Sequence, residues 1–353
     1  MPVTTAGIPT SARAAGRPSG ATPRRRRLAV IAVLLVLLVI VVLLSLAVGA
    51  KPIPLPEVWQ AIWSPTGSEA DLVIRTLRAP RTLLGLVVGI ALGIAGALIQ
   101  GHTRNPLADP GLLGVSAGAA FMVVIGIYAF GITNLYGYVW LAFAGAFAAS
   151  AVVFVLGTVG GGGPTPVTLA LAGLAVSAFL DALTSAVVLA DNATLNEYRF
   201  WAVGSVAGRG TDVVVQILPF IIAGLVLAVI NAPALNLLGL GEDVANGLGL
   251  NLRAARWTGL VAITLLTGAA TAACGPIAFV GLVVPHIARK FTGPDYRWLV
   301  PASGLAGAVL LLCADVIGRV VVRPGELQAG IVLAFVGVPV FIALVRRHRL
   351  VQL

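Results

Sequence analysis

The stretch Asn236-Leu-Leu-Gly-Leu-Gly-Glu-Asp-Val-Ala-Asn-Gly-Leu-Gly-Leu-Asn251 is short, rich in glycine and polar, and it separates two long apolar runs. Leu240, Val244 and Leu248 recur at i, i+4 and i+8, which places them on one face of a helix. Gly239 and Gly241 interrupt the pattern near its start, which predicts a pair of short helices. The apolar face can lie on lipid, pack on the protein's own bundle or bind a soluble partner.

The composition around this stretch is that of a membrane protein. The chain has 353 residues, of which 59% are hydrophobic and 10% charged, and its mean hydropathy is +1.02. Soluble proteins carry about 25% charged residues, so the predicted fold class is an all-α polytopic membrane protein. The net charge of +10 does not indicate nucleic-acid binding, because the basic residues lie in the tails and between apolar runs. Cys274 and Cys313 have apolar neighbours and are interpreted as small buried residues rather than a disulfide or metal site.

The first apolar run, Leu28–Val48, follows a tail at 1–27 that is rich in Ser, Thr, Pro and Arg and is expected to be disordered. A secretory signal peptide is the competing interpretation, but its apolar region has about 7–15 residues. The run is longer than that, so it is predicted to be a retained membrane span. The transmembrane domain 28–347 is expected to be followed by a short cytoplasmic tail at 348–353.

Ten spans of about 20 residues each account for the apolar runs. The break at Cys274-Gly275-Pro276 could instead kink one longer segment, which would lower the number of spans. After the first span, the predicted ranges are 80–101, 112–131, 137–159, 166–190, 212–231, 255–273, 277–290, 299–320 and 329–345.

The distribution of basic residues supports this arrangement. With ten spans and both termini cytoplasmic, 15 of the 23 Lys and Arg residues lie on the cytoplasmic side, as the positive-inside rule predicts. The chain is therefore expected in the plasma (inner) membrane as a multi-pass protein. The stretch 236–251 then lies in the cytoplasm, and the connections 51–79 and 191–211 lie outside.

Glycine recurs every three or four residues in the second span, at Gly85, Gly89, Gly93 and Gly96. Small residues at this spacing let two helix backbones approach closely in lipid. The pattern predicts either tight packing inside the bundle or a contact between subunits.

Charged residues inside apolar runs are candidates for function. Asp181 lies in the middle of a span, where carboxylates usually face a bundle interior or a water-filled path. It either lines a substrate path or is capped by Thr184, Ser185 or a polar group of another helix. Asp315 and Arg319 are four residues apart on one helix and are predicted to pair with each other.

No residue pattern for catalysis is present in the sequence. His286 has no second candidate ligand nearby, so it is interpreted as a capping or packing group and no metal site is predicted. The chain has no GxxxxGK[ST] phosphate loop, so it cannot hydrolyse ATP by the usual route. We expect no enzyme activity and no cofactor on this chain, and the energy for any transport must come from another protein.

Several arginines lie on the predicted outer side, where the positive-inside rule disfavours them. Arg78 and Arg81 flank Pro80 at the outer end of the second span, with Arg75 one turn earlier. Arg319 and Arg323 lie at the outer end of the ninth span. An acidic soluble protein that docks on this face would explain them. Contacts with lipid headgroups are the alternative.

Four motifs, three of them longer than ten residues, resemble those of the permease subunits of the ABC importers for iron–siderophores, haem and vitamin B12. The similarity extends over about residues 28–347. The motifs are Arg78-Ala-Pro-Arg81, Gly89-Ile-Ala-Leu-Gly-Ile-Ala-Gly-Ala-Leu-Ile-Gln100, Asn105-Pro-Leu-Ala-Asp-Pro-Gly-Leu-Leu-Gly-Val-Ser-Ala-Gly-Ala119 and Gly275-Pro-Ile-Ala-Phe-Val-Gly-Leu-Val-Val-Pro-His-Ile-Ala-Arg289.

The resemblance implies ten spans per subunit and short cytoplasmic coupling helices. It also implies a second permease subunit, either an identical copy or a related paralogue, around a central path. Two cytoplasmic ABC ATPase subunits would bind ATP and Mg²⁺, and an extracytoplasmic binding protein would deliver the cargo. The implied function is import of an iron–siderophore, with haem or cobalamin as alternatives. An ion-coupled secondary transporter is a distant alternative, since it would need several charges near the midplane.

The resemblance also assigns residues to three sites. Arg78, Arg81 and Arg319 match the basic residues that dock the binding protein. Asn105, Leu107 and Thr165 match the cytoplasmic gate, to which our own interpretation adds Asp181 as a path residue. The residues that match the ATPase-coupling segment are Leu237, Leu238, Gly239, Leu240, Gly241, Glu242, Val244, Ala245, Leu248 and Gly249.

Overall fold

The computed structural model describes residues 24–49, 51–158 and 166–349, and all regular secondary structure in these ranges is helical. The helices in chain order are α1 (Arg24–Ala47), α2 (Leu55–Trp63), α3 (Glu69–Leu72), the π-helix η1 (Val73–Arg78), α4 (Ala79–Thr103), the 3₁₀-helix η2 (Pro110–Leu113), α5 (Val115–Phe130), α6 (Leu135–Thr158), α7 (Pro166–Ala190), α8 (Asn192–Ala202), α9 (Thr211–Leu238), α10 (Glu242–Gly247), α11 (Leu252–Cys274), α12 (Val280–Thr292), α13 (Tyr296–Val321) and α14 (Ala329–Arg349).

Each of the ten predicted spans coincides with one of these helices, namely α1, α4, α5, α6, α7, α9, α11, α12, α13 and α14. Within the described residues, seven helices are long and apolar enough to cross a membrane by themselves, and α5 and α14 contribute shorter apolar helices. The 13 residues of α12 rise only about 20 Å, less than the ~30 Å hydrocarbon core. The all-α polytopic fold is confirmed.

The break at Cys274 ends a helix rather than kinking one. Gly275 has φ +76°, a conformation that favours glycine, and α12 does not begin until Val280. Residues 275–279 are therefore a non-helical connection, and the alternative of one long kinked span is wrong.

Two predicted connections contain helices that the apolar pattern did not reveal. The segment 51–79 includes α2, α3 and η1, and the segment 191–211 includes α8. Local caps start two of these helices: Ser68 and Asp71 form a capping box at α3, and the Asp191 side chain accepts a bond from the backbone of Thr194 at α8. At the chain ends, α1 already begins at Arg24 and α14 continues to Arg349, because arginine is a good helix former.

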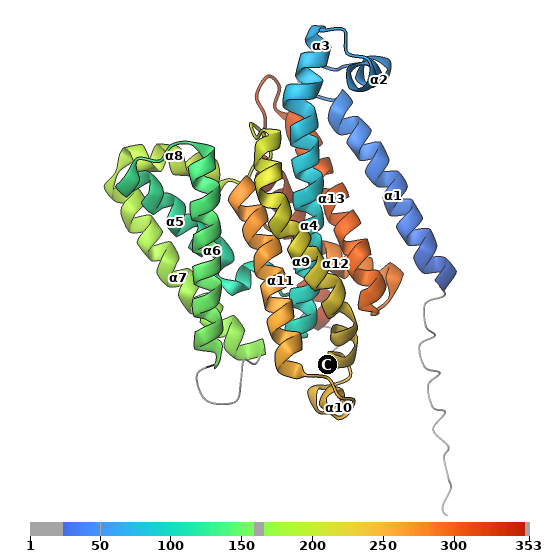
Figure 1. The fold of residues 1–353 in the computed structure, drawn as a ribbon, viewed down its shortest axis with the longest axis vertical. Coiled ribbons are helices and arrows are strands. Elements are labelled where there is room, and N and C mark those ends of the chain that lie inside the picture. The colour runs from blue at the N-terminus through green and yellow to red at the C-terminus, as the bar shows by residue number, and fades with distance from the viewer. Residues whose placement is uncertain (1–23, 50, 159–165, 350–353) are drawn as a thin grey trace, which may run out of the picture.

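The bundle has a central helix, α4, which packs against α13, α11, α9 and α12. Figure 1 shows α1 (blue) along one side, next to α13, and a lobe made of α5, α6, α7 and α8 on the other side. The beginning of α1 lies at the same end of the bundle as α10 (Figure 1). Helices α2, α3 and α8 lie at the opposite end, so the two ends of the bundle carry different elements.

The glycine ladder of α4 is a packing surface within the chain. A Cβ atom added at Gly89 would lie 2.5 Å from the Cα of Ala308, and one at Gly85 would lie 2.8 Å from the Leu312 side chain. The same face continues down the helix, where added Cβ atoms at Gly93 and Gly96 would overlap the backbone of Ser303 and Gly281. Of the two predicted roles, internal packing against α13 and α12 is confirmed for these four glycines.

We expect Gly89→Val to destabilise the protein by about 1–3 kcal/mol, the usual cost of overpacking a close contact. The contact is with backbone, which cannot move aside as a flexible side chain can. Thermal unfolding of the purified protein in detergent measures the effect. Gly247→Ala is the control, because no atom lies within 4 Å of its added Cβ; equal melting temperatures for both variants would contradict the packing role.

Candidate functional sites at the two ends of the bundle

The glycine-rich stretch at 236–251 forms one short helix, not two. Asn236 to Leu238 continue α9, and the chain turns at Gly239 and Leu240 before α10 begins at Glu242. Gly241 has φ +111°, a value that few non-glycine residues adopt, so this residue makes the break. The predicted interruption is confirmed, but the predicted pair of short helices is wrong.

Contacts at the start of α10 and at the end of α9 hold this part of the chain on the bundle. Glu242 forms ion pairs with Arg256 of α11 at 2.5 Å and with Arg104 after α4 at 3.5 Å. Asn236 bonds to the Asp295 carboxylate and to the backbone of Tyr296, both at 2.8 Å, which ties the end of α9 to the start of α13. A force on α10 is therefore transmitted to α4, α9, α11 and α13.

The apolar face of α10 is open to solvent. The exposed fractions of Leu240, Val244 and Leu248 are 62%, 50% and 60%, whereas Ala245 on the opposite face is fully buried. Packing on the protein's own bundle is therefore excluded for the three large residues. Leu238 and Ala245 are buried, so among the predicted coupling residues these two support the helix and do not present a surface.

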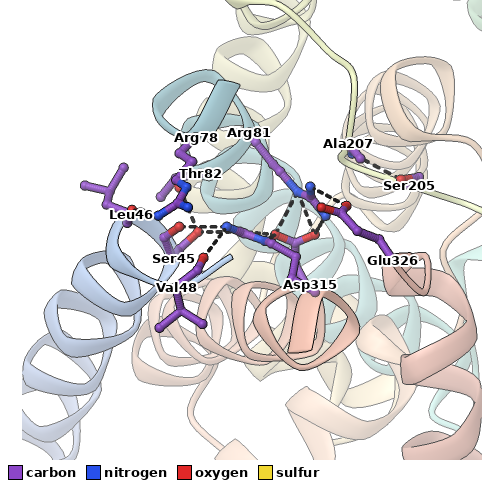
Figure 2. A network of polar contacts seen from close by, with 11 residues as sticks. Ser45, Leu46, Val48, Arg78, Arg81, Thr82, Ser205, Ala207, Asp315 and Glu326 are labelled. Carbon is purple, nitrogen blue, oxygen red and sulfur yellow. Dashed lines mark hydrogen bonds and ion pairs between the residues drawn. The ribbon is translucent and has the colours of Figure 1, made fainter. Parts of the chain in front are cut away.

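The opposite end of the bundle holds a buried network of charges (Figure 2). Asp315 of α13, whose side chain is 1% exposed, accepts bonds from Arg81 of α4 at 2.7 to 3.1 Å. The second oxygen of Asp315 pairs with Arg319 one turn further along α13, as predicted from their spacing. Arg81 also bonds to Glu326 at 2.7 Å. Its guanidinium group is therefore paired with two carboxylates, those of Asp315 and Glu326.

Three arginines also bind the C-terminal end of α1. The last carbonyl groups of a helix have no partner within the helix and carry partial negative charge. Arg78 donates to the carbonyls of Leu46, Ala47 and Lys51, and Arg319 donates to those of Ser45 and Val48. Arg323 donates to the carbonyl of Gly49 at 3.0 Å. These basic residues therefore have partners in their own chain.

The three arginines predicted to dock the binding protein are largely enclosed by contacts within their own chain. Arg78 and Arg319 are buried, and Arg81 is 11% exposed, with its exposed side covered by Glu326. A direct ion pair between Arg78 or Arg319 and a second protein requires that the acceptors from α1 be displaced. The docking role of the three arginines stays a prediction, and in this conformation they join α1, α4 and α13.

The predicted gate and path residues do not form one cluster. Asn105 and Leu107 lie in the turn after α4, where the Asn105 side chain accepts a bond from the backbone of Leu107 at 2.9 Å. Leu107 packs with Leu282 and Val283 of α12. Asp181 lies about 22 Å along α7 from its first residue and is exposed, and Thr165 lies outside the described residues.

Neither Thr184 nor Ser185 caps the carboxylate of Asp181, although the sequence suggested both as capping groups. Among the described residues, no hydrogen bond joins Asp181 to Thr184 or Ser185, and the buried Thr184 hydroxyl has no partner. Asp181 shares an exposed face of α7 with Ala178, Ala182 and Ser185. This face is available to a second subunit or to a water-filled path.

Two residues of this charge network were not assigned a role from the sequence. Ser45, near the end of α1, bonds to Thr82 of α4 at 2.7 Å and to Arg319 at 2.8 Å. Glu326 lies in the connection after α13 and is brought to Arg81 by the fold. The partners of Ser45 and Glu326 are all more than 30 residues away from them in sequence, so no local spacing could have identified these contacts.

Comparison with known proteins identifies the family. The model of the FecCD transport family matches residues 37–347. The ferric enterobactin transport system permease protein FepD of Escherichia coli (strain K12) is 49% identical over 306 residues, covering 86% of this chain and 91% of FepD. The hemin transport system permease protein HmuU of Yersinia pestis is 38% identical, covering 82% of this chain and 88% of HmuU.

A solved structure with the same fold supports this assignment. It is described as an inward-facing conformation of a metal-chelate type ABC transporter, and it superposes with a TM-score of 0.80 at 29% identity over 90% of this chain and 99% of that chain. The four motifs noted above lie inside the matched region. The chain belongs to the FecCD transport family and is a permease subunit of the ABC-importer type.

Proposed function

We propose that this permease moves a ferric siderophore from an extracytoplasmic binding protein to the cytoplasm. The observation that carries the proposal is the 49% identity to a ferric enterobactin permease over 86% of the chain. The protein named "Probable siderophore transport system permease protein YfiZ" of Bacillus subtilis (strain 168) is also 40% identical over 82% of the chain. Haem import is the second candidate, since the hemin permease HmuU is 38% identical, and cobalamin import is the third.

ATP hydrolysis on separate ATPase subunits drives the transport. The exposed face of Leu240, Val244 and Leu248 is the contact for the ATPase, and the ion pairs of Glu242 pass its movement to α4 and α11. Closure of the ATPase subunits would shift the population from an inward-open to an outward-open state. This chain performs no covalent chemistry, and ATP and Mg²⁺ bind to the partner.

A second permease subunit completes the path. The exposed face of α7 with Asp181 lies against this subunit or lines the path between the two. Both termini and α10 lie in the cytoplasm, where most of the basic residues gather. The binding protein docks at the opposite end, near the network of Arg78, Arg81 and Arg319.

Uptake by the reconstituted complex tests the cargo. The permease, its ATPase and its binding protein are placed in proteoliposomes, and accumulation of ⁵⁵Fe-labelled ferric siderophore is compared with that of haem and labelled cobalamin. We expect the siderophore to accumulate and the other two to remain at the background of ATP-free vesicles. Accumulation of haem or cobalamin alone would overturn the cargo and keep the mechanism.

A further inference from the structure

A cavity of about 610 Å³ lies between the three helices α4, α9 and α13. Helix α4 contributes Ile90 and Ile94, α9 contributes residues between Leu225 and Pro233, and α13 contributes residues between Tyr296 and Leu305. The lining is apolar except for Tyr296 and Arg297, which are neighbours at the start of α13. The volume is in the range of ligand sites, about 300–1,000 Å³. The cavity therefore has an apolar body and one polar end.

The length and the position of the cavity match one leaflet of a bilayer. Arg297 lies two residues before the predicted span 299–320, where a basic side chain reaches the headgroups. From Arg297 to Leu305 the lining runs about 12 Å along α13, close to half of the ~30 Å hydrocarbon core. Val229 on the α9 side is 67% exposed, so the cavity opens toward the lipid. An acyl chain of one leaflet can lie along it.

Positive charge is in excess at the polar end. Within residues 24–49, 51–158 and 166–349, no hydrogen bond or ion pair holds the Arg297 side chain, whose backbone amide donates to Asp295 at 3.1 Å. Arg289 adds a second cation, because its guanidinium donates to the Tyr296 hydroxyl at 3.1 Å and lies 5.5 Å from the centre of that ring. The Asp295 carboxylate is already paired with Arg27 at 3.3 Å. An anionic group at this end would therefore meet positive charge that is not neutralised.

We propose that this cavity binds an anionic phospholipid, with an acyl chain between α9 and α13 and the phosphate at Arg297. Arginine can form two parallel bonds to a phosphate, and basic sites between membrane helices are suited to anionic headgroups. Helix α7, which is proposed to meet the second permease subunit, contributes no residue to the cavity. The lipid belongs to the leaflet on the α10 side, which the proposed function places at the cytoplasm. The site itself depends neither on the cargo nor on ATP.

The test measures lipid binding to the full-length permease–ATPase complex in detergent by native mass spectrometry. The probes are phosphatidylglycerol, phosphatidylcholine with the same acyl chains, and glycerophosphoglycerol, which is the anionic headgroup without chains. We expect phosphatidylglycerol to bind at least fivefold more tightly than phosphatidylcholine, and Arg297→Gln to remove most of this preference, since one basic residue near a membrane surface contributes about fivefold. Glycerophosphoglycerol should not compete at the concentrations at which the lipid binds.

A second variant, Val229→Trp, fills the apolar body and leaves Arg297 in place. We expect it to weaken phosphatidylglycerol binding roughly tenfold, the effect of about two methylene groups that are no longer buried. Val215→Trp is the matched control, because both valines belong to α9 and are 67% exposed, but Val215 does not line the cavity. It should bind the lipid as the wild type does.

Arg253→Gln is the control for charge, because Arg253 is exposed at the start of α11, next to α10, and does not line the cavity. An equal loss in Arg253→Gln would assign the preference to the general charge of this end and overturn the site. Unchanged binding in Arg297→Gln or in Val229→Trp would also overturn it.

Two further outcomes would give the cavity to another occupant. Competition by glycerophosphoglycerol at the affinity of the lipid would reassign it to a free phosphate group. Loss of the second permease subunit in Val229→Trp, but not in Val215→Trp, would reassign it to a contact between subunits. Failure of the wild type in the uptake assay above would contradict the proposed function and leave the lipid measurement intact.

Discussion

Replacing Leu240 with aspartate is expected to remove the ATPase from the purified complex and to abolish ATP-driven uptake. Leu240 is 62% exposed and lies on the apolar face with Val244 and Leu248. Burying a side chain of this size against a partner contributes about 1.5–3 kcal/mol, and an aspartate there would also bury an unpaired charge. We therefore expect at least a tenfold loss of association, which corresponds to about 1.4 kcal/mol, and Leu248→Asp should act in the same way.

The control for this experiment is Asn246→Asp, which introduces the same charge on the polar side of α10, where Asn246 is exposed. It should retain the ATPase and support normal uptake. The melting temperature of the isolated permease should be unchanged in all three variants, because none of the three side chains packs in the bundle. If the Leu240→Asp and Leu248→Asp complexes retained the ATPase in full, the coupling role of α10 would be wrong.

Replacing Asp315 with alanine is expected to destabilise the permease by about 3–5 kcal/mol, the usual cost of removing one partner from a buried ion pair. Asp315 is 1% exposed and neutralises Arg81 and Arg319. Without it, two buried guanidinium groups lose their counter-charge, and the contact of α1 with α4 and α13 through Ser45 is weakened. Thermal unfolding in detergent measures the loss.

Glu326→Gln is the matched comparison, because Glu326 pairs with the same Arg81 but is 40% exposed. An exposed ion pair contributes about 1 kcal/mol or less, so this variant should melt close to the wild type. A melting temperature for Asp315→Ala equal to that of Glu326→Gln would show that the buried network does not stabilise the fold.

Much of the fold could be predicted because membrane spans follow from local composition. Each span needs a long apolar run, and all ten predicted ranges coincide with helices. The Asp315–Arg319 pair was predictable for the same reason, since its two members are one turn apart on a helix. Helices α2 and α8 were not predicted because they are short and lie outside the apolar runs. The start of α8 is marked only by its capping residue Asp191, and α2 has no side-chain cap.

The role of the outer arginines could not be obtained from sequence. Their partners are the last carbonyls of α1, and backbone groups leave no signature in side-chain identity. Arg81 meets Asp315 only because α4 packs closely along α13.

The measurement that tests the account most directly is the energy requirement of uptake in proteoliposomes that contain the permease, its ATPase and its binding protein. Accumulation of ferric siderophore is followed with ATP, with a non-hydrolysable ATP analogue, and after omission of each component in turn. We expect accumulation only when all three proteins and hydrolysable ATP are present, because this chain lacks a phosphate loop. Accumulation by the permease alone, driven by an ion gradient, would contradict it.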